Sequence, residues 1–242
     1  MTQNPDLVNS PIESAPAIRR MFNTIAPTYD RLNHLLSLGR DIRWRKKAIA
    51  LLRDKQGGRF LDLACGSGDL SLEALSLHPS RIVATDFAEN MLDVFRRKLS
   101  GLSPGIPVDL VAADVHALPF PSSDFDVAMV AFGIRNFADR LGSLREMHRV
   151  LKPGGKVLIL ELTTPTAPLI RHGYLLYGRF FLPMIGRLVS GHSGAYNYLP
   201  ESIEQFPEND QFLRLMTSAG FSSVRAISLS FGTATIFLGS KA

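Results

Sequence analysis

RFLDLACGSGDL, from Arg59 to Leu70, is an apolar run that leads into two closely spaced glycines and then into a helical pattern. Glycine tolerates positive φ and lets the backbone approach a ligand closely, so Gly66 and Gly68 predict a turn from a strand into a helix. Many turns of this kind bind a nucleotide cofactor, whereas others only reverse the chain. The role of this turn therefore depends on the residues that follow it.

Outward from this turn, apolar runs of strand length alternate with helical patterns. Such alternation predicts a parallel sheet with helices on both faces and right-handed crossovers. Two final strands joined at Phe231-Gly232 predict an antiparallel hairpin at the end of the chain. We therefore expect an α/β fold with a seven-stranded, mostly parallel sheet. Its predicted strands are Arg59–Ala64, Arg81–Thr85, Val108–Ala112, Phe125–Phe132, Lys156–Leu162, Ser223–Leu229 and Thr233–Gly239.

Two segments stand apart from the alternation. Residues 1–16 carry three prolines and predict a mobile arm, and residues 17–242 form the main domain. Within it, residues 17–57 are helical and basic and predict a cap over the mouth of the domain. Residues 163–207 are rich in proline and contain no clean strand, so we expect an insertion on the substrate side.

Composition limits the function further. The 242 residues carry 27 Lys+Arg and 22 Asp+Glu, a mild net charge of +5. A lone cysteine, Cys65, suits the reducing cytoplasm, and no apolar run approaches the roughly 18 residues of a membrane span. The chain is expected to be a cytoplasmic enzyme acting on a small molecule, with room for a peripheral position on the inner face of the membrane.

Two acids follow predicted strands beside the glycine turn. Asp86 lies 18 positions after Gly68 and can accept both ribose hydroxyls of a nucleoside, and Asp114 can accept from an adenine amino group. Either could instead only cap a helix. Asp69 places a carboxylate where the diphosphate of a dinucleotide would lie, which repels it. S-adenosylmethionine carries no phosphate, and its cationic groups favour acidic neighbours, so it is the expected cofactor.

Other chemistries fit less well. The six histidines never occur at a spacing typical of metal ligands, so no metal is expected, and His116 reads as a solvent-side loop residue. A cytosine methyltransferase needs a cysteine near its target, yet Cys65 lies in the cofactor turn. Residues 131–134 read AFGI, not the acidic or amide residue and two prolines of adenine methyltransferases. Nucleic acid is therefore not an expected partner.

Four blocks carry a resemblance to a known family. YDRLN at 29–33, followed by Ser37 and Trp44, is similar to an N-terminal signature, from which Asp41 departs because a histidine is usual there. RVLKPGG at 149–155, FGIRN at 132–136 and YNYLPESI at 196–203 match three further blocks. Together they resemble the class I S-adenosylmethionine-dependent methyltransferases, and more closely the family that C-methylates the quinone ring in menaquinone and ubiquinone biosynthesis.

This resemblance implies a Rossmann-like class I methyltransferase fold and cofactor contacts at Ser67, Asp86, Asp114 and Val115. The implied reaction transfers a methyl group to a ring carbon of a prenylated quinol, with demethylmenaquinol as the first candidate. A demethylated ubiquinol precursor or another small hydrophobic acceptor is the alternative. A lipid-binding module without catalysis is a third interpretation.

C-methylation requires an electron-rich ring, and a quinol hydroxyl titrates near 10, so the site must stabilise the quinolate. Arg135, after the fourth predicted strand, is expected to stabilise the oxyanion and Asn136 to orient the ring. An ion pair with Asp139 or Glu161 is the structural alternative for Arg135. The residues expected to complete the pocket are Tyr29, Tyr196 and His192.

The insertion suits a hydrophobic acceptor. It offers apolar residues such as Ile170, Tyr174 and Phe180, and arginines at 171, 179 and 187. Each buried prenyl CH₂ contributes about 0.8 kcal/mol, and basic residues can hold the site against anionic lipid. We expect a transient contact with a membrane surface, while core packing or a homodimer interface would explain the same residues.

Overall fold

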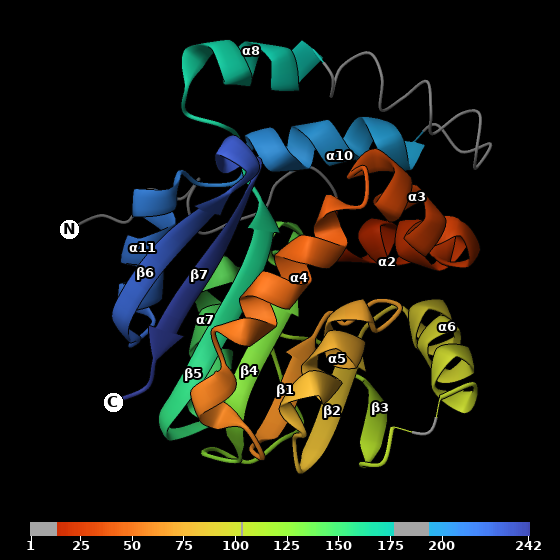
Figure 1. Cartoon of the computed structure of the whole chain (residues 1–242), viewed down its shortest axis with the longest axis vertical. Coiled ribbons are helices and arrows are strands. Elements are labelled where there is room, and N and C mark those ends of the chain that lie inside the picture. The colour runs from red at the N-terminus through yellow and green to blue at the C-terminus, as the bar shows by residue number, and fades with distance from the viewer. Residues whose placement is uncertain (1–13, 103, 177–193) are drawn as a thin grey trace.

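A computed structural model describes residues 14–102, 104–176 and 194–242. Its centre is one seven-stranded sheet in the order β3-β2-β1-β4-β5-β7-β6. Neighbouring strands from β3 to β5 are parallel, and β7 is antiparallel to both β5 and β6 (Figure 1). The predicted seven-stranded sheet with its closing hairpin is confirmed. The strands are β1 Arg59–Leu63, β2 Arg81–Asp86, β3 Val108–Ala112, β4 Phe125–Ala131, β5 Leu151–Leu162, β6 Ser222–Leu229 and β7 Ala234–Ser240.

The largest difference from the predicted strands lies in β5, which begins at Leu151 and not at Lys156. Leu151 pairs with Phe125 of β4, and the register then shifts before Val127 pairs with Lys156. Gly154 has a φ of 74°, a conformation that costs glycine little. The Pro-Gly-Gly segment is therefore a bulge within the strand, where a turn before the strand was predicted.

Helices cover both faces of the sheet and bury one hydrophobic cluster on each. Trp44, Ala48 and Ile49 pack into the cluster on one face, and Leu144 and Phe212 pack into the other. Figure 1 shows α4 and α5 in front of the sheet and α7 and α11 behind it. These four helices are α4 Arg40–Ala50, α5 Asp69–Ala74, α7 Arg140–Val150 and α11 Asn209–Ser218.

Of the remaining helices, α6 packs against β2 and β3, and the other four lie above the carboxyl ends of the parallel strands (Figure 1). Helix α2 begins at Ala15, two residues before the predicted boundary of the arm, and residues 1–13 lie outside the described part of the chain. In the region of the predicted insertion, α8 and α10 lie at the top of the view. The helices are α2 Ala15–Ile25, α3 Tyr29–Leu36, α6 Glu89–Ser100, α8 Pro168–Leu176 and α10 Gly194–Glu204.

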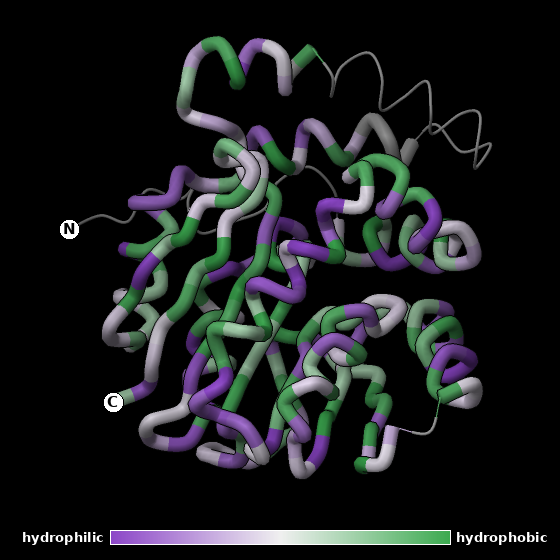
Figure 2. Tube along the Cα trace, viewed as in Figure 1, coloured by the Kyte–Doolittle hydropathy of each residue, from purple (hydrophilic) through white to green (hydrophobic). Residues whose placement is uncertain are grey.

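Hydropathy follows this architecture. Figure 2 shows mainly hydrophobic residues along the central strands and mixed colouring on the outer helices. Within the described ranges, no helix combines the length and the apolar character needed to cross a bilayer. The sheet places β1 between β2 and β4, where successive crossovers run in opposite directions, and ligands of such folds bind at the carboxyl ends beside this point.

Candidate active site

The glycine turn begins the site. Gly66 and Gly68 have φ values of 54° and 86°, and α5 starts directly after Gly68. A Cβ on Gly68 would lie 2.2 Å from the ring of Phe95, whereas a Cβ on Gly66 would find Tyr29 at 3.8 Å. Gly68 is thus required by packing as well as by conformation, and Gly66 by conformation alone.

Asp86 ends β2 and lies against this turn. Its carboxylate accepts hydrogen bonds from the backbone N–H groups of Gly66 and Ala88, both at 2.8 Å. Burial raises the pKa of Asp86 to about 6, although these backbone bonds oppose the shift. A buried carboxylate at the end of a strand, held by the glycine turn, can accept further donors from a ligand.

Asp86 faces a cavity of about 80 Å³, which we call the cofactor cavity. Asp114 and Val115 line it together with Gly66. Helix α2 contributes Phe22, so the N-terminal helices border this cavity. The cavity thus brings together four predicted cofactor residues from three strand ends: Gly66 after β1, Asp86 at the end of β2, and Asp114 and Val115 after β3.

His116 lies in a turn after β3 with its side chain 30% exposed, and it also lines the cofactor cavity. Its Nδ1 lies 2.6 Å from Asp114 Oδ1, and its Nε2 accepts the backbone N–H of Asp139 at 3.2 Å. The neutral ring therefore carries its proton on Nδ1 and donates to Asp114. Burial acts to raise the pKa of Asp114, but the two N–H groups of His116 outweigh it and hold that pKa below its usual value.

A third, small cavity of about 30 Å³ shares Gly66 with the cofactor cavity, and its charged lining residues are Asp62, Asp69 and Arg45. Ser67 borders it, and its hydroxyl donates to Asp30 of α3. Asp62 of β1 borders it too and accepts a hydrogen bond from Ser71 at 2.6 Å. The other oxygen of Asp62, Oδ1, is buried and has no partner in the described structure.

Asp62 was missed by the sequence reasoning. Burial raises the pKa of Asp62 to about 7, because a charged carboxylate is unfavourable inside an apolar strand. An acid at such a position is unusual. That placement, directly before the glycine turn, is the signal that could have identified it. An unpartnered buried carboxylate oxygen fits a cationic ligand group, such as the amino group of S-adenosylmethionine, so the observed residues fit this cofactor.

Asp69 has a different environment from the one assumed for it. Lys98 Nζ lies 2.7 Å from its Oδ1, and Arg45 contacts its Oδ2 at 3.3 Å. Its negative charge is therefore compensated, and repulsion of a diphosphate by Asp69 is a weaker argument than the sequence suggested. His34, Asp41 and Asp69 also form a cluster with the geometry of a metal site, but Arg45 already bridges the two carboxylates.

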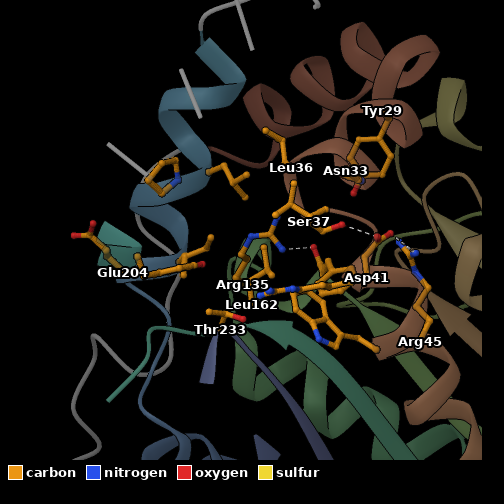
Figure 3. A pocket seen from close by; sticks show the side chains of 18 residues that line it. Tyr29, Asn33, Leu36, Ser37, Asp41, Arg45, Arg135, Leu162, Glu204 and Thr233 are labelled. Carbon is orange, nitrogen blue, oxygen red and sulfur yellow. Dashed lines mark hydrogen bonds and ion pairs between the residues drawn. The ribbon is translucent and has the colours of Figure 1, made fainter. Parts of the chain in front are cut away.

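A cavity of about 280 Å³, larger than the two just described, lies between α3, α4 and α10, and we call it the acceptor cavity (Figure 3). Leu36, Trp44, Leu162 and Ile203 make much of its wall apolar. Of the insertion residues proposed for the acceptor, Tyr174 lines it, and residues 177–193, including His192, lie outside the described part. Tyr196 belongs to α10, but its side chain is also outside the described part.

Tyr29 borders all three cavities. Burial raises the pKa of its phenol above the ordinary value, although Arg135 and Arg45 oppose the shift. The phenol is therefore protonated at neutral pH and can donate a hydrogen bond, but it is a poor base.

Arg135 lines the acceptor cavity and is buried. Its Nη1 lies 2.8 Å from Glu161 Oε1 and also donates to the carbonyl of Phe132, and its Nε donates to Ser202 at 3.3 Å. The ion pair with Glu161 named as an alternative is therefore present, whereas Asp139 caps α7. Burial alone would lower the pKa of Arg135, but Glu161 outweighs it and raises that pKa, so the guanidinium stays charged.

Asn136 occupies a different place from Arg135. It lines the cofactor cavity, and its Oδ1 accepts a hydrogen bond from Tyr198 of α10 at 2.8 Å. The two predicted catalytic neighbours therefore face different cavities. Asn136 connects the cofactor side to the helix that covers the acceptor.

Comparison with known proteins identifies the family. The model of the ubiE/COQ5 methyltransferase family matches residues 12–241. A demethylmenaquinone methyltransferase from Thermus thermophilus is 46% identical over 91% of this chain and 100% of its own length. A protein from Geobacter sulfurreducens named ubiquinone/menaquinone biosynthesis C-methyltransferase UbiE is 45% identical over 95% of this chain and 90% of its own.

Solved structures show the same fold at much lower identity. An S-adenosylmethionine-dependent methyltransferase from Aquifex aeolicus has a TM-score of 0.58 at 17% identity, covering 81% of this chain and 89% of its own. The cyclase SpnF has a TM-score of 0.65 at 15% identity, covering 97% and 98%. These likenesses establish the Rossmann-like fold, and the sequence matches establish the family. The chain belongs to the ubiE/COQ5 methyltransferase family.

Proposed function

We propose that this protein transfers a methyl group from S-adenosylmethionine to a ring carbon of a prenylated quinol, with demethylmenaquinol as the preferred acceptor. The observation that carries this proposal is the meeting of two unlike cavities at Tyr29 and Phe132. The cofactor cavity is bordered by Asp86 and Asp114, and the acceptor cavity is larger and has the buried arginine Arg135 in its wall. The relatives whose names specify a substrate act on demethylmenaquinone or in ubiquinone and menaquinone biosynthesis.

The proposed cofactor-binding residues are those predicted from the sequence together with Asp62. The predicted residues are Gly66, Ser67, Gly68, Asp86, Asp114 and Val115. When bound, S-adenosylmethionine supplies an electrophilic methyl group on a sulfonium. Asp86 accepts from ribose hydroxyls, and Asp62 compensates the positive charge of the amino group. The protein's main contribution to such a displacement is the alignment of donor and acceptor.

On the acceptor side, Arg135 stabilises the quinolate oxygen. Its fixed positive charge lies in a buried wall of the acceptor cavity, where electrostatic stabilisation is stronger than in water. Glu161 holds the guanidinium in place and so positions it. Tyr29, kept protonated by burial, donates a hydrogen bond to the ring oxygen, and Asn136 orients the ring from the cofactor side.

The acceptor must be reduced, because only the quinol ring is electron-rich. The test is incubation with radiolabelled S-adenosylmethionine and a short-chain demethylnaphthoquinone, with and without a chemical reductant. We expect label in the quinone only with the reductant. Absence of transfer to both naphthoquinols and benzoquinols would contradict the proposal, and absence of S-adenosylmethionine binding as well would favour a lipid-binding module. Mass spectrometry of the quinones in a strain lacking this chain would distinguish the two acceptor classes.

We also propose a transient contact with a membrane surface, because a prenylated acceptor partitions into the bilayer. A cytoplasmic position with peripheral attachment is part of this proposal. The predicted homodimer and the predicted lack of nucleic-acid binding stay predictions, which light scattering and a gel-shift assay would check.

A further inference from the structure

Helix α4 has one buried and one basic face. Trp44, Ala48 and Ile49 are buried against the sheet. The exposed side carries four cations and no acid, and α4 crosses the front of the view in Figures 1 and 2 with mostly hydrophilic residues. These exposed cations are Arg40, Arg43, Lys46 and Lys47.

The net charge of the protein is concentrated in this part of the chain. Residues 15–55 contain ten of the 27 Lys+Arg but three of the 22 Asp+Glu, so their net charge is +7 and that of all other residues is −2. Buried Arg45 pairs with Asp41 and Asp69. Among the residues that the structure describes, no acidic side chain forms an ion pair with the four exposed cations of α4.

Exposed apolar side chains lie on α4, in the turn before it and in a turn hydrogen-bonded to it. Leu38, in the turn before α4, is 75% exposed and also lines the acceptor cavity, so it stands at the cavity rim. Ile42 is 42% exposed and Phe231 is 78% exposed. Trp44 Nε1 donates to the hydroxyl of Ser230 at 2.9 Å, which ties the turn that carries Phe231 to α4.

We propose that this surface docks on a bilayer containing anionic lipids. We call it the docking face, and it comprises Arg40, Arg43, Lys46, Lys47, Leu38, Ile42 and Phe231. Cations attract the headgroups, while leucine, isoleucine and phenylalanine enter the boundary between headgroups and acyl chains. Nucleic acid would pair with the cations, but it would not bury the exposed side chains of Leu38 and Ile42. The inference rests on the proposed function in one respect, which is that a bilayer holds the acceptor.

The position of Leu38 connects the docking face to the acceptor cavity. Because this residue belongs both to the outer surface and to the acceptor cavity, docking would bring the cavity rim to the bilayer. A prenylated ring could then pass from lipid to the cavity without crossing water, which saves the cost of exposing its apolar chain. The sequence placed the membrane contact within residues 163–207, whereas the docking face lies on α4 and its neighbouring turns.

Cosedimentation with vesicles of phosphatidylglycerol and phosphatidylcholine tests the charged part. Each Lys or Arg near such a surface is worth about 1 kcal/mol, roughly a fivefold change in partitioning. R43Q/K47Q should lower the partition coefficient about 25-fold, and added salt should weaken binding of the unaltered protein. R145Q/R214Q removes the same charge from exposed positions on α7 and α11, behind the sheet, and should change partitioning less than threefold.

A second pair of variants tests the apolar part. I42S/F231S should lower partitioning about tenfold even in high salt, because it removes insertion and leaves the charge. Equal losses in R43Q/K47Q and R145Q/R214Q would mean that net charge alone attracts the protein, and would overturn the inference. Absence of vesicle binding by the unaltered protein would also overturn it. Unchanged circular dichroism and thermal midpoints confirm that the variants fold.

Activity separates this inference from the proposed function. R43Q/K47Q should methylate a water-soluble short-chain quinol at the normal rate and lose activity only on a long-chain acceptor in vesicles. If the unaltered protein binds vesicles through α4 but methylates no quinol, the proposed function fails and the docking face stands.

Discussion

The cofactor side and the acceptor side of the site meet at Tyr29, but they are constructed differently. The cofactor side consists of strand ends and a glycine turn, and hydrogen bonds from Gly66 and Ala88 fix Asp86. The acceptor side is a space between α3, α4 and α10, whose residues come from distant parts of the chain. A ligand common to all methyltransferases of this fold needs the first construction, and a variable acceptor permits the second.

The two sides also differ in how charge is handled. On the cofactor side, the buried oxygen Oδ1 of Asp62 has no partner in the described structure, so charge is left for a ligand to compensate. On the acceptor side, Glu161 accompanies the buried charge of Arg135. On the cofactor side, Asp62 can therefore compensate a positive charge that the ligand brings. On the acceptor side, the positive charge belongs to the protein, and Glu161 keeps Arg135 in a fixed position.

The largest expected effect concerns Arg135. R135Q should lower kcat/KM about 10²- to 10³-fold, because it removes the charge proposed to stabilise the quinolate. The dissociation constant of S-adenosylmethionine, measured by calorimetry, should stay the same, since Arg135 lines the acceptor cavity and not the cofactor cavity.

A double variant controls for the ion pair. R135Q alone leaves Glu161 buried without its partner, which destabilises the fold, so R135Q/E161Q should recover thermal stability. It should not recover turnover. Recovery of turnover would mean that Arg135 only neutralises Glu161.

The next effect concerns the glycine turn. G68A should lower the free energy of unfolding by about 2–4 kcal/mol, because its Cβ would lie 2.2 Å from Phe95 and its φ is positive. G66A meets its nearest atom at 3.8 Å and should cost about 1 kcal/mol. Urea denaturation measures both. Similar losses would show that packing against Phe95 does not distinguish the two glycines.

An intermediate effect concerns pH on the cofactor side. The pKa of Asp62 is about 7 in the cofactor-free protein, so its carboxylate gains a proton as pH falls through 7. Affinity for S-adenosylmethionine should fall roughly tenfold between pH 7.5 and pH 6, since the neutral acid no longer compensates the ligand's positive charge. D62N should bind weakly with a shallower pH dependence, whereas equal slopes would exclude Asp62 from binding.

D62N should weaken cofactor binding, but it should raise the stability of the fold. The folded-state pKa of Asp62 lies above its unfolded value, so folding is favoured when the group is protonated, and this contribution is lost as pH rises through about 7. At pH 8, the free energy of unfolding of D62N should therefore exceed that of the unaltered protein by about 4 kcal/mol, and the difference should shrink by pH 5. Urea denaturation at both pH values checks this sign.

The smallest effect concerns the contact between the two sides. Y198F removes the hydroxyl that donates to Asn136 at 2.8 Å, and it should lower the free energy of unfolding by about 1 kcal/mol. We expect a few-fold rise in KM for the acceptor and little change in cofactor affinity. A loss of turnover beyond a hundredfold would show that Tyr198 does more than position Asn136.

The difference between the cofactor side and the acceptor side explains which features could be predicted from the sequence. Strand alternation and glycine spacing are local patterns, so the sheet, Gly66, Gly68, Asp86 and Asp114 could be located before the structure was known. The acceptor cavity depends on packing between α3, α4 and α10, which no local pattern specifies. On the cofactor side, an acid inside an apolar strand is a signal for Asp62 in the sequence. Its unpartnered oxygen and the contact of His116 with Asp139, however, depend on three-dimensional placement.

The most direct test of the account is to locate the transferred methyl group. The protein would be incubated with S-adenosylmethionine carrying a deuterated methyl group and with reduced demethylnaphthoquinone, and the product analysed by mass spectrometry and NMR. We predict a trideuterated methyl group on the ring carbon next to the carbonyl. A label on a quinol oxygen, or an unlabelled acceptor despite saturating cofactor, would contradict the central claim.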